Sequence, residues 1–503
     1  MKNSLGRWIP DDAKPFISSH NYLTEKRKFI EEKKQGEKTL FFSSYKDAFH
    51  HFKLKSEMTF SFHHHLRNGD YVLNQVCKTV EEEGLTNLHF APSSIFPSYI
   101  GLIDLIKNEQ ITNIHTNYLN GPVSSIIKDG FLKGKLIMNT HGGRARSIES
   151  GELPIDVAFL ACPTVDKLGN GSGSQGKSAC GTLGYAISDL KYAKTVLLVT
   201  DNVIEHLDEF QFDHKYVDGI IVVDSIGDPS GIVSGTTKIT RDPIGLKIAK
   251  DTSILLNELG VLQNGFSMQT GAGGTSLAVV DYIKNIMIKK SIKGSFASGG
   301  ITGHYVDMMK HNLFSRLYDV QCFDLEAIKS FKENSNHIAI SASKYGNPFE
   351  ESPIVNDLSF VILGATEIDL DFNVNVTTDS LGNIIGGSGG HSDTSNGANI
   401  TIITSALTKS RVPIIKERVT TISTPGEDVD ILVTERGIAI NPKRQDLISK
   451  LIHSSLKIVT IEKLMEITYK ITGIPKAIEK SDSIIGLVEY RDGSIIDCLY
   501  KSR

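Results

Sequence analysis

The sequence lacks the features of a membrane-spanning, secreted or nucleic-acid-binding protein. No apolar run approaches the roughly 20 residues that a membrane span requires, and the N-terminus lacks the apolar stretch of a signal peptide. The five cysteines are odd in number and never spaced as Cys-x-x-Cys, which disfavours a disulfide framework. Lys and Arg number 54 against 58 for Asp and Glu, so no excess of positive charge attracts nucleic acid. These absences favour a cytoplasmic protein whose cysteines are small buried side chains.

The order of apolar and polar residues predicts an α/β fold with mainly parallel sheets. At about 150 residues per domain, the 503 residues suffice for two to four domains. Short β-branched runs alternate with amphipathic stretches, as in α/β proteins. We expect strands at 155–162, 194–201 and 219–224, and helices at 69–84 and 242–260.

The two halves of the chain share a repeated pattern. Phe60 and Phe266 lie 206 residues apart, and several other pairs share this offset. Asp166 and Asp369 each follow an apolar run and precede an asparagine by four residues, with an offset of 203. We therefore expect a tandem duplication of one α/β domain. Chance similarity between two unrelated strand–helix–strand units is the alternative.

The duplication and the charge pattern divide the chain into three parts. Residues 1–45 are charged and weakly periodic, and 25–38 predict a solvated helix or arm. The first domain is expected at 46–255 and the second at 256–503. No chemistry is assigned to the arm.

Two glycine-rich turns follow expected strands of the second half. Gly271, Gly273 and Gly274 precede a helical pattern, so N–H groups at the start of that helix could hold a phosphate or an oxyanion. Gly299 and Gly300 form a second turn, and the carboxyl ends of neighbouring parallel strands meet in one crevice. The sequence departs from the dinucleotide-binding pattern at its third glycine and at its acidic residue. A purely structural tight turn is the alternative.

A third glycine-rich segment, GGSGG at 386–390, formally matches the Gly-x-Ser-x-Gly motif of serine hydrolases. That motif requires a helix directly after the serine, and the following residues predict a polar turn and a strand instead. We therefore expect a glycine loop in which Gly389 and Gly390 present His391 and Asp393 beside a ligand. A hairpin turn is the alternative.

Several histidines lie close together in the sequence and raise the question of a metal site, but their spacing argues against one. His63, His64 and His65 lie near His50 and His51 in sequence. Adjacent residues of a strand point to opposite faces, and no spacing matches a closed zinc site, so no metal is expected. Because 63–65 occupy the duplicate of the 271–274 turn, we interpret them as a polar wall of an interdomain site.

Three charged residues are candidates for substrate binding or catalysis. Arg144 and Arg146 are expected in a loop with two glycines, where their planar guanidinium groups suit carboxylates. Glu367 ends an apolar strand, which makes it a candidate general base or nucleophile. A solvated charged loop and an ordinary solvated acid are the respective alternatives.

Together these segments resemble the citrate lyase alpha subunit family, the citrate CoA-transferase component of that enzyme. The resemblance covers the chain from about residue 40 and rests on many motifs in order. They include SFHHHLRNGDYVLN, HGGRARSIESGELPIDVAFLA, VVDSIGDPSGIVSGTT, QTGAGGTSLAV, FASGGITG, ISASKYGNPF, GATEIDLDFNVNV, GGSGGHSDT and VTERGIAINPKRQDL. The resemblance implies two similar α/β domains of the NagB/RpiA/CoA-transferase type.

The resemblance also implies an activity and its partners. Acetyl thioester on an acyl carrier protein and citrate would give citryl thioester and acetate, and a beta (lyase) subunit would then cleave the citryl group. The thiol would belong to a phosphoribosyl-dephospho-CoA arm on the gamma (acyl carrier) subunit, so acetyl-CoA is an analogue. No permanently bound cofactor, no nucleic acid and no membrane are expected, and the protein is expected to be oligomeric.

The sequence departs from broader CoA-transferases at one important position. Relatives of that wider group carry a nucleophilic glutamate at the turn where this chain reads FASGGITG, with Ser298, Gly299 and Gly300. A covalent glutamyl intermediate at that position is therefore excluded, and we expect direct attack of a citrate carboxylate on the thioester. If a covalent intermediate did form, Glu367 would be the first residue to suspect.

The family resemblance suggests a role for each candidate group. The 271–274 turn would hold the oxyanion or pantetheine arm, 389–393 would hold the carrier group, and Arg144 and Arg146 would bind citrate carboxylates. A citramalate or other acid CoA-transferase subunit, or a non-catalytic scaffold of the lyase complex, is the alternative function.

Overall fold

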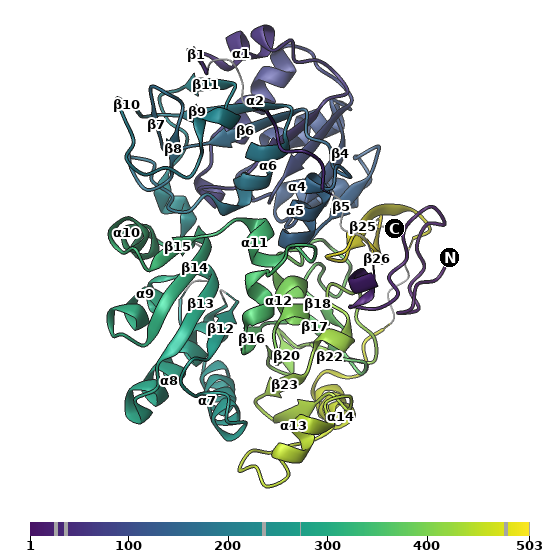
Figure 1. Ribbon diagram of the computed structural model, residues 1–503. Coiled ribbons are helices and arrows are strands. Elements are labelled where there is room, and N and C mark those ends of the chain that lie inside the picture. Colours follow the sequence, from purple (N-terminus) through teal and green to yellow (C-terminus); the bar gives the residue numbers. More distant parts are fainter. Residues whose placement is uncertain (25–28, 35–38, 234–237, 272, 477–480, 502–503) are drawn as a thin grey trace.

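Two large, mainly parallel β-sheets follow one another along the chain. The computed structural model describes residues 1–24, 29–34, 39–233, 238–271, 273–476 and 481–501. One sheet occupies the upper part of the molecule and the other the lower part, with short helices between them (Figure 1). In the described residues, no helix is both long enough and apolar enough to span a membrane. All five cysteines are buried, as expected.

The first sheet is formed by strands of the first half and by the C-terminal hairpin. Its order is β1 (Leu40–Phe42), β11 (Gly219–Val222), β9 (Thr195–Thr200), β6 (Val157–Ala161), β2 (Thr59–Phe62), β3 (Leu88–Pro92), β4 (Ile111–Thr116), β5 (Leu136–Met138), β25 (Ile484–Glu489) and β26 (Ile495–Tyr500). All neighbours pair in parallel except β25 and β26. The three strands expected at 155–162, 194–201 and 219–224 are confirmed as β6, β9 and β11.

The second sheet repeats the strand order of the first. Its order is β15 (His337–Ala339), β14 (Phe314–Cys322), β13 (Gly294–Ile301), β12 (Ser267–Thr270), β16 (Phe360–Leu363), β19 (Thr401–Thr404), β23 (Ile431–Thr434) and β24 (Gly437–Ile440). Starting from β5 in one sheet and β15 in the other, seven successive strands correspond in chain order and position. This correspondence confirms the duplicated α/β fold.

Small three-stranded sheets extend the duplication. They consist of β10 (Val203–Ile204), β7 (Thr164–Asp166) and β8 (Gly171–Ser172) in the first half, and of β22 (Ile415–Lys416), β17 (Glu367–Asp369) and β18 (Val374–Asn375) in the second. In each, the central strand pairs in parallel on one side and antiparallel on the other. Asp166 accepts hydrogen bonds from the backbone and side chain of Asn170, and Asp369 does the same with Asn373. A separate hairpin joins β20 (Thr408–Lys409) to β21 (Val412–Pro413).

Helices cover both sheets and fill the space between them. The α-helices are α1 (Tyr45–His51), α2 (Val72–Glu82), α3 (Gly101–Lys107), α4 (Pro122–Lys128), α5 (His141–Glu149), α6 (Ile187–Tyr192), α7 (Pro243–Glu258), α8 (Gly274–Lys290), α9 (Gly303–Lys310), α10 (Leu325–Glu333), α11 (Ala342–Gly346), α12 (His391–Gly397), α13 (Gln445–Lys450) and α14 (Ile461–Thr472). The expected helices at 69–84 and 242–260 are confirmed as α2 and α7. The Asp242 side chain caps α7, because it accepts hydrogen bonds from the backbone N–H groups of Ile244 and Gly245.

The region between the sheets has its own apolar core. Ala145 of α5 and Tyr185 of the 3₁₀ helix η3 (Gly184–Ala186) pack with Val320 of β14 and Tyr345 of α11. Figure 1 shows α5, α6 and α11 between the two sheets. The two halves are therefore packed against each other, and residues of both can contribute to one site.

The chain termini correct the expected domain division. The C-terminal strands β25 and β26 join the first sheet, so the second domain does not run to residue 503. The Asn3 side chain donates to the backbone carbonyls of Ile495 and Ile496, and Phe16 packs edge-on against Tyr490. The first residues of the expected arm are thus bound to the C-terminal hairpin.

The middle of the arm also differs from the expectation. Residues 25–28 and 35–38 of the expected solvated segment lie outside the described residues, and the described 29–34 contain no helix. Lys33 forms an ion pair with Asp218, and Glu32 accepts a hydrogen bond from Tyr216. The segment between the two gaps therefore lies against the first domain.

Candidate functional site

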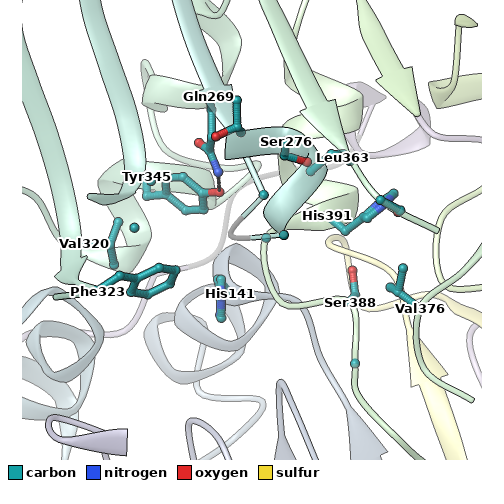
Figure 2. Close-up of a pocket in the computed structure, with 18 of the residues that line it drawn as sticks. His141, Gln269, Ser276, Val320, Phe323, Tyr345, Leu363, Val376, Ser388 and His391 are labelled. Carbon is teal, nitrogen blue, oxygen red and sulfur yellow. Dashed lines mark hydrogen bonds between the residues drawn. The ribbon is translucent and has the colours of Figure 1, made fainter. Parts of the chain in front are cut away.

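The main candidate site is a cavity of about 420 Å³ where the two halves meet. Most of its wall comes from the second half, at the carboxyl ends of β12, β13, β14 and β16 and from the loop before α12. The first half contributes His141, at the start of α5, and Tyr185. Figure 2 shows His141 below the cavity and Gln269 of β12 above it. The cavity is thus a crevice at the carboxyl ends of parallel strands, where α/β sheets bind ligands.

The first glycine turn forms one side of the cavity. Gly271 and Gly273 line it, and Gly274 is the first residue of the 17-residue helix α8. No side chain caps this helix, so its first N–H groups need acceptors from outside the helix. A methyl group at Gly273 would contact nothing within 4 Å. The Gly271 N–H group already donates to the carbonyl of Ile362, at 2.8 Å, and is not available for a ligand.

Gly299 and Gly300 line the same cavity, as expected for neighbouring parallel strands, but they lie within strand β13 and not in a turn. The pairing of β13 with β14 shifts register between Gly299 and Gly300. Gly299 has a φ of +107°, and a side chain there would meet Gln269 at 2.6 Å. A side chain at Gly300 would come within 2.3 Å of the Phe323 ring. These close approaches explain why both positions require glycine.

The GGSGG segment is followed by a helix, contrary to the expectation of a turn. Helix α12 begins at His391, and Gly390 and His391 line the cavity, whereas Gly389 does not. The Ser388 hydroxyl donates to Ser392 and not to a histidine, so Ser388 is not an activated nucleophile in this arrangement. Gly389 has a φ of +52° and accepts a hydrogen bond from the His141 backbone N–H, at 2.8 Å.

His391 faces the cavity with both ring nitrogens engaged. Its Nε2 atom donates to the Gly364 carbonyl at 3.1 Å, and its Nδ1 atom lies 2.8 Å from the hydroxyl of Thr424. Burial lowers the pKa of His391 to about 4, so the ring is neutral near pH 7. His391 therefore shapes the cavity but presents no free base in this arrangement.

Asp393 does not reach the cavity and holds the two halves together instead. Its carboxylate accepts hydrogen bonds from the Thr140 hydroxyl and the Gly142 backbone N–H, both at 2.8 Å. The Arg491 Nε atom lies 3.5 Å from the same carboxylate. Burial raises the pKa of Asp393 to about 6. The residue thus anchors the start of α5, which carries His141.

The two arginines proposed to bind citrate lie on helix α5 and not in a loop, and both are buried away from the cavity. Arg144 donates to both carboxylate oxygens of Asp189, at 2.9 and 3.0 Å. Arg146 donates to Glu152 at 2.6 Å and to Glu489 at 3.1 Å. Because these carboxylates already occupy both guanidinium groups, the expectation that the pair binds citrate is wrong for this arrangement.

The three histidines do not converge on one point and do not line the cavity. His63 lies 2.8 Å from the Ala161 carbonyl, His64 lies 2.6 Å from the Ser93 hydroxyl, and His65 lies 2.9 Å from a carboxylate oxygen of Asp70. Burial lowers the pKa values of His63 and His64. The three histidines therefore do not form the expected polar wall. His64 is connected to the cavity only through Tyr185, a lining residue whose ring centre lies 4.6 Å from that of His64.

Glu367 is also buried outside the cavity wall. Its carboxylate forms an ion pair with Lys416 and accepts hydrogen bonds from Asn375, Ser380 and the Thr420 backbone. Burial raises its pKa, but Lys416 and these hydrogen bonds outweigh burial, so the pKa is lower than usual. This arrangement gives Glu367 a structural role and contradicts its expected position in the crevice.

Sequence reasoning missed the aromatic and amide groups of the site. The His141 ring lies 4.6 Å from Tyr185, and Gln269 donates to the Tyr345 hydroxyl at 2.8 Å. Asn117 donates to Nδ1 of His141 at 2.8 Å, which leaves the Nε2–H group of the neutral ring for the cavity. Burial and the nearby Arg144 lower the pKa of His141 to about 3. The motif HGGRAR contains this histidine, but the sequence analysis assigned a function only to the two arginines of the motif.

Asp319, Cys322 and His337 form one buried group of potential metal ligands in the described residues. The Cys322 thiol donates to Asp319 at 3.0 Å, and Nε2 of His337 lies 3.0 Å from the same oxygen. His337 also contacts the Ser330 hydroxyl through Nδ1. These contacts satisfy the polar atoms as a hydrogen-bonded network without an ion.

The chemistry of the cavity wall is that of neutral donors. Among its described lining residues, none is Asp, Glu, Lys or Arg. Backbone N–H groups at the start of α8 and the Nε2–H group of His141 are suited to stabilise a developing oxyanion. The described part of the wall offers no nucleophilic carboxylate.

Comparisons with known proteins agree on one family. The family model for the citrate lyase alpha subunit (CitF) matches residues 38–502. A citrate lyase alpha chain of Klebsiella pneumoniae is 41% identical, over 98% of this chain and 96% of its own length. The alpha chain of Haemophilus influenzae is 43% identical, over 91% and 92%.

Solved structures give the same result. A putative alpha subunit of citrate lyase from Streptococcus mutans, in complex with citrate, has a TM-score of 0.96 and 40% identity, and the match covers 100% of both chains. A Pseudomonas malonate decarboxylase has a TM-score of 0.60 at 13% identity, covering 86% of this chain and 87% of the other. The second likeness shows the fold alone.

Proposed function

The chain belongs to the citrate lyase alpha subunit family, and on that premise we propose that it transfers the thioester of an acetyl-acyl carrier protein to citrate. The products are citryl-acyl carrier protein and acetate. One observation carries the proposal: the cavity between the halves is lined by glycines of two segments and by the N-terminal end of helix α8, with no described carboxylate among its lining residues. The relative from Streptococcus mutans, whose structure contains citrate, supports citrate as the acid.

The transfer is proposed to occur in a ternary complex. A citrate carboxylate oxygen attacks the acetyl carbonyl carbon, a C–O bond forms, and the C–S bond breaks to give a mixed anhydride and a thiolate. The thiolate then attacks the citryl carbonyl of the anhydride, a C–S bond forms, and acetate leaves. One thioester replaces another, so the reaction needs positioning more than energy.

The chain's own groups would stabilise the oxyanion formed in each attack. The first N–H groups of α8, beginning at Gly273 and Gly274, have no side-chain cap to compete with a ligand. His141 supplies a neutral Nε2–H group from the opposite side of the cavity. Exclusion of water by the bound substrates would limit hydrolysis of the thioester and the anhydride.

The carrier and the other subunits belong to the same proposal. The thiol would be that of a phosphoribosyl-dephospho-CoA arm on a gamma subunit, and no cofactor would remain bound to this chain between turnovers. A beta subunit would cleave the citryl thioester, within an oligomeric complex in the cytoplasm. A chain that only held these subunits together would have no transfer activity of its own.

The test is an assay of the purified chain with acetyl-CoA and citrate, with citryl-CoA and acetate measured by mass spectrometry. We expect the two products in equal amounts. If neither forms, the assay is repeated with acetylated carrier protein. Citryl carrier would then show strict carrier dependence, whereas no product in either assay would refute the transferase.

A second assay tests the absence of a covalent enzyme intermediate. The chain is incubated with acetyl-CoA and hydroxylamine, digested, and searched for a glutamyl hydroxamate by peptide mass. We expect none, because no described glutamate lines the cavity. A hydroxamate on Glu367 or any other glutamate would overturn the ternary mechanism while leaving the transferase in place.

A further inference from the structure

One arginine close to the cavity has no carboxylate partner among the described residues. Arg144, Arg146 and Arg491 are each buried beside an acidic side chain. Arg67, in the 3₁₀ helix η2 (Arg67–Gly69), is partly buried, and its Nη1 atom donates a hydrogen bond to the Ile232 carbonyl, at 3.3 Å. A guanidinium group has five N–H donors, so most of them are left for water or a ligand.

Aromatic rings hold this guanidinium group in position. Its central carbon lies 5.4 Å from the ring centre of Phe96 and 4.8 Å from that of Phe323. Such contacts stabilise the cation and restrict its rotation, while the N–H groups at its edge keep their hydrogen-bonding capacity. The backbone of Arg67 has a φ of +54°, a conformation that a non-glycine residue adopts only where surrounding contacts impose it.

The position of Arg67 connects it to the proposed site. Phe323, which packs against the guanidinium group, lines the cavity. Tyr185, a second lining residue, lies close enough for its hydroxyl to interact electrostatically with Arg67. Burial lowers the pKa of Arg67, the direction expected for a cation without a counter-charge. An anion bound at this edge of the cavity would remove that cost.

We propose that Arg67 binds a carboxylate of citrate, one that does not react with the thioester. The inference rests on the proposed function, because citrate brings several carboxylates to a cavity whose described lining residues include no cation. A planar carboxylate matches the fork of N–H groups that the aromatic contacts leave open. Arg67 thus replaces Arg144 and Arg146 as the residue that selects a polycarboxylate acid.

The test measures binding of citrate alone to the full chain by calorimetry, which requires no turnover. We expect Arg67→Gln to weaken citrate binding at least tenfold, and Arg67→Lys to weaken it less, because lysine keeps the charge but loses the paired donors. CoA binding should not change. Arg316→Gln, at an exposed arginine of β14, is the matched control and should leave both affinities unchanged. The melting temperature of each variant shows whether it is folded. If Arg67→Gln is misfolded, the citrate affinity of Arg67→Lys is used to test the proposal.

Each remaining outcome contradicts the inference or separates it from the proposed function. Weaker CoA binding with unchanged citrate binding would assign Arg67 to the phosphates of the carrier arm and overturn the proposal. Unchanged binding of both ligands, or no citrate binding by the wild-type chain, would also overturn it. If the wild-type chain binds citrate through Arg67 but forms no citryl thioester, the proposed function fails and the assignment of Arg67 stands.

Discussion

In the first half of the chain, strand β2 leads through His63, His64 and His65 toward α2, whereas in the second half the equivalent strand β12 leads through the 271–274 turn into α8. The histidine side chains contact a carbonyl, a hydroxyl and a carboxylate of their own half. The described glycines of the other turn offer no side chains, and Gly271 and Gly273 line the cavity. The turn of this strand–turn–helix unit is therefore occupied by packed side chains in the first half, which we call the filled half. In the second half, the open half, the turn leaves space for a ligand.

This difference shows how a duplicated fold can assign its two copies different tasks. The filled half contributes His141 and Tyr185 to the cavity, and it keeps its buried charges paired for stability. The open half contributes the 271–274 turn, the glycines at the end of β13 and an uncapped helix N-terminus. Substitutions at the three histidines and the buried ion pairs of the first half should therefore lower mainly stability, and substitutions in the 271–274 turn should lower mainly activity.

The largest effect is expected from Arg144→Ala in the filled half. The substitution leaves Asp189 buried without its partner, and breaking such a pair costs about 3–5 kcal/mol of unfolding free energy. Urea unfolding measures this loss, and the KM for citrate of the folded fraction should not change. Arg316→Ala, at an exposed position, should change stability by less than about 0.5 kcal/mol. Normal stability with a raised KM for citrate would restore Arg144 as a citrate ligand.

The next effect is expected from Gly273→Leu in the open turn. A side chain at this position meets no protein atom within 4 Å at its first carbon, so it should extend into the cavity without disturbing the fold. We expect kcat/KM for transfer to fall at least a hundredfold, about 2.7 kcal/mol of transition-state stabilisation, with the melting temperature unchanged. Gly273→Ala should cause a smaller loss. Full activity in the leucine variant would place the reaction elsewhere.

The fold could be predicted further than the site because its signals are local and repeated. The apolar runs of β6, β9 and β11 and the caps of α7 each act within a few residues, and the offset between Phe60 and Phe266 reports the duplication directly. The C-terminal hairpin was missed because β25 pairs with β5, some 350 residues earlier, and no local pattern encodes such a pairing.

The site was only partly predictable because a charged residue looks the same whether or not it has a partner. Arg144 and Glu367 were candidates by residue type, but their roles depend on Asp189 and Lys416, which are distant in sequence. The glycine-rich segments were found because glycine is the residue that allows the unusual backbone conformations and close approaches of such sites. His141 was overlooked since a neutral histidine becomes recognisable only through its neighbours.

A smaller effect is expected from His64→Ala, which opens part of the filled turn. The substitution removes the ring that packs on Tyr185 and leaves the Ser93 hydroxyl without this partner, for a loss of about 2 kcal/mol in unfolding free energy. Activity should fall less than tenfold, because His64 does not line the cavity. The exposed His453→Ala is the control for both measurements. A hundredfold loss of kcat at normal stability would instead give the first-half turn a direct part in the reaction.

The smallest effect is expected from Asp393, whose carboxylate in the open half binds the start of α5 in the filled half. This effect concerns the pH dependence of the free energy of unfolding. Burial raises the pKa of this carboxyl from 3.8 to about 6. The folded chain therefore binds a proton more tightly than the unfolded chain, and the free energy of unfolding should fall as pH rises from about 4 to 6. Asp393→Asn should make this fall shallower by at most about 1.4 kcal/mol per pH unit, measured by urea unfolding at several pH values. Asp208→Asn, at a fully exposed residue, is the control and should leave the slope unchanged. If Asp393→Asn has the same slope as the wild-type chain, the Asp393 carboxyl does not titrate in this pH range.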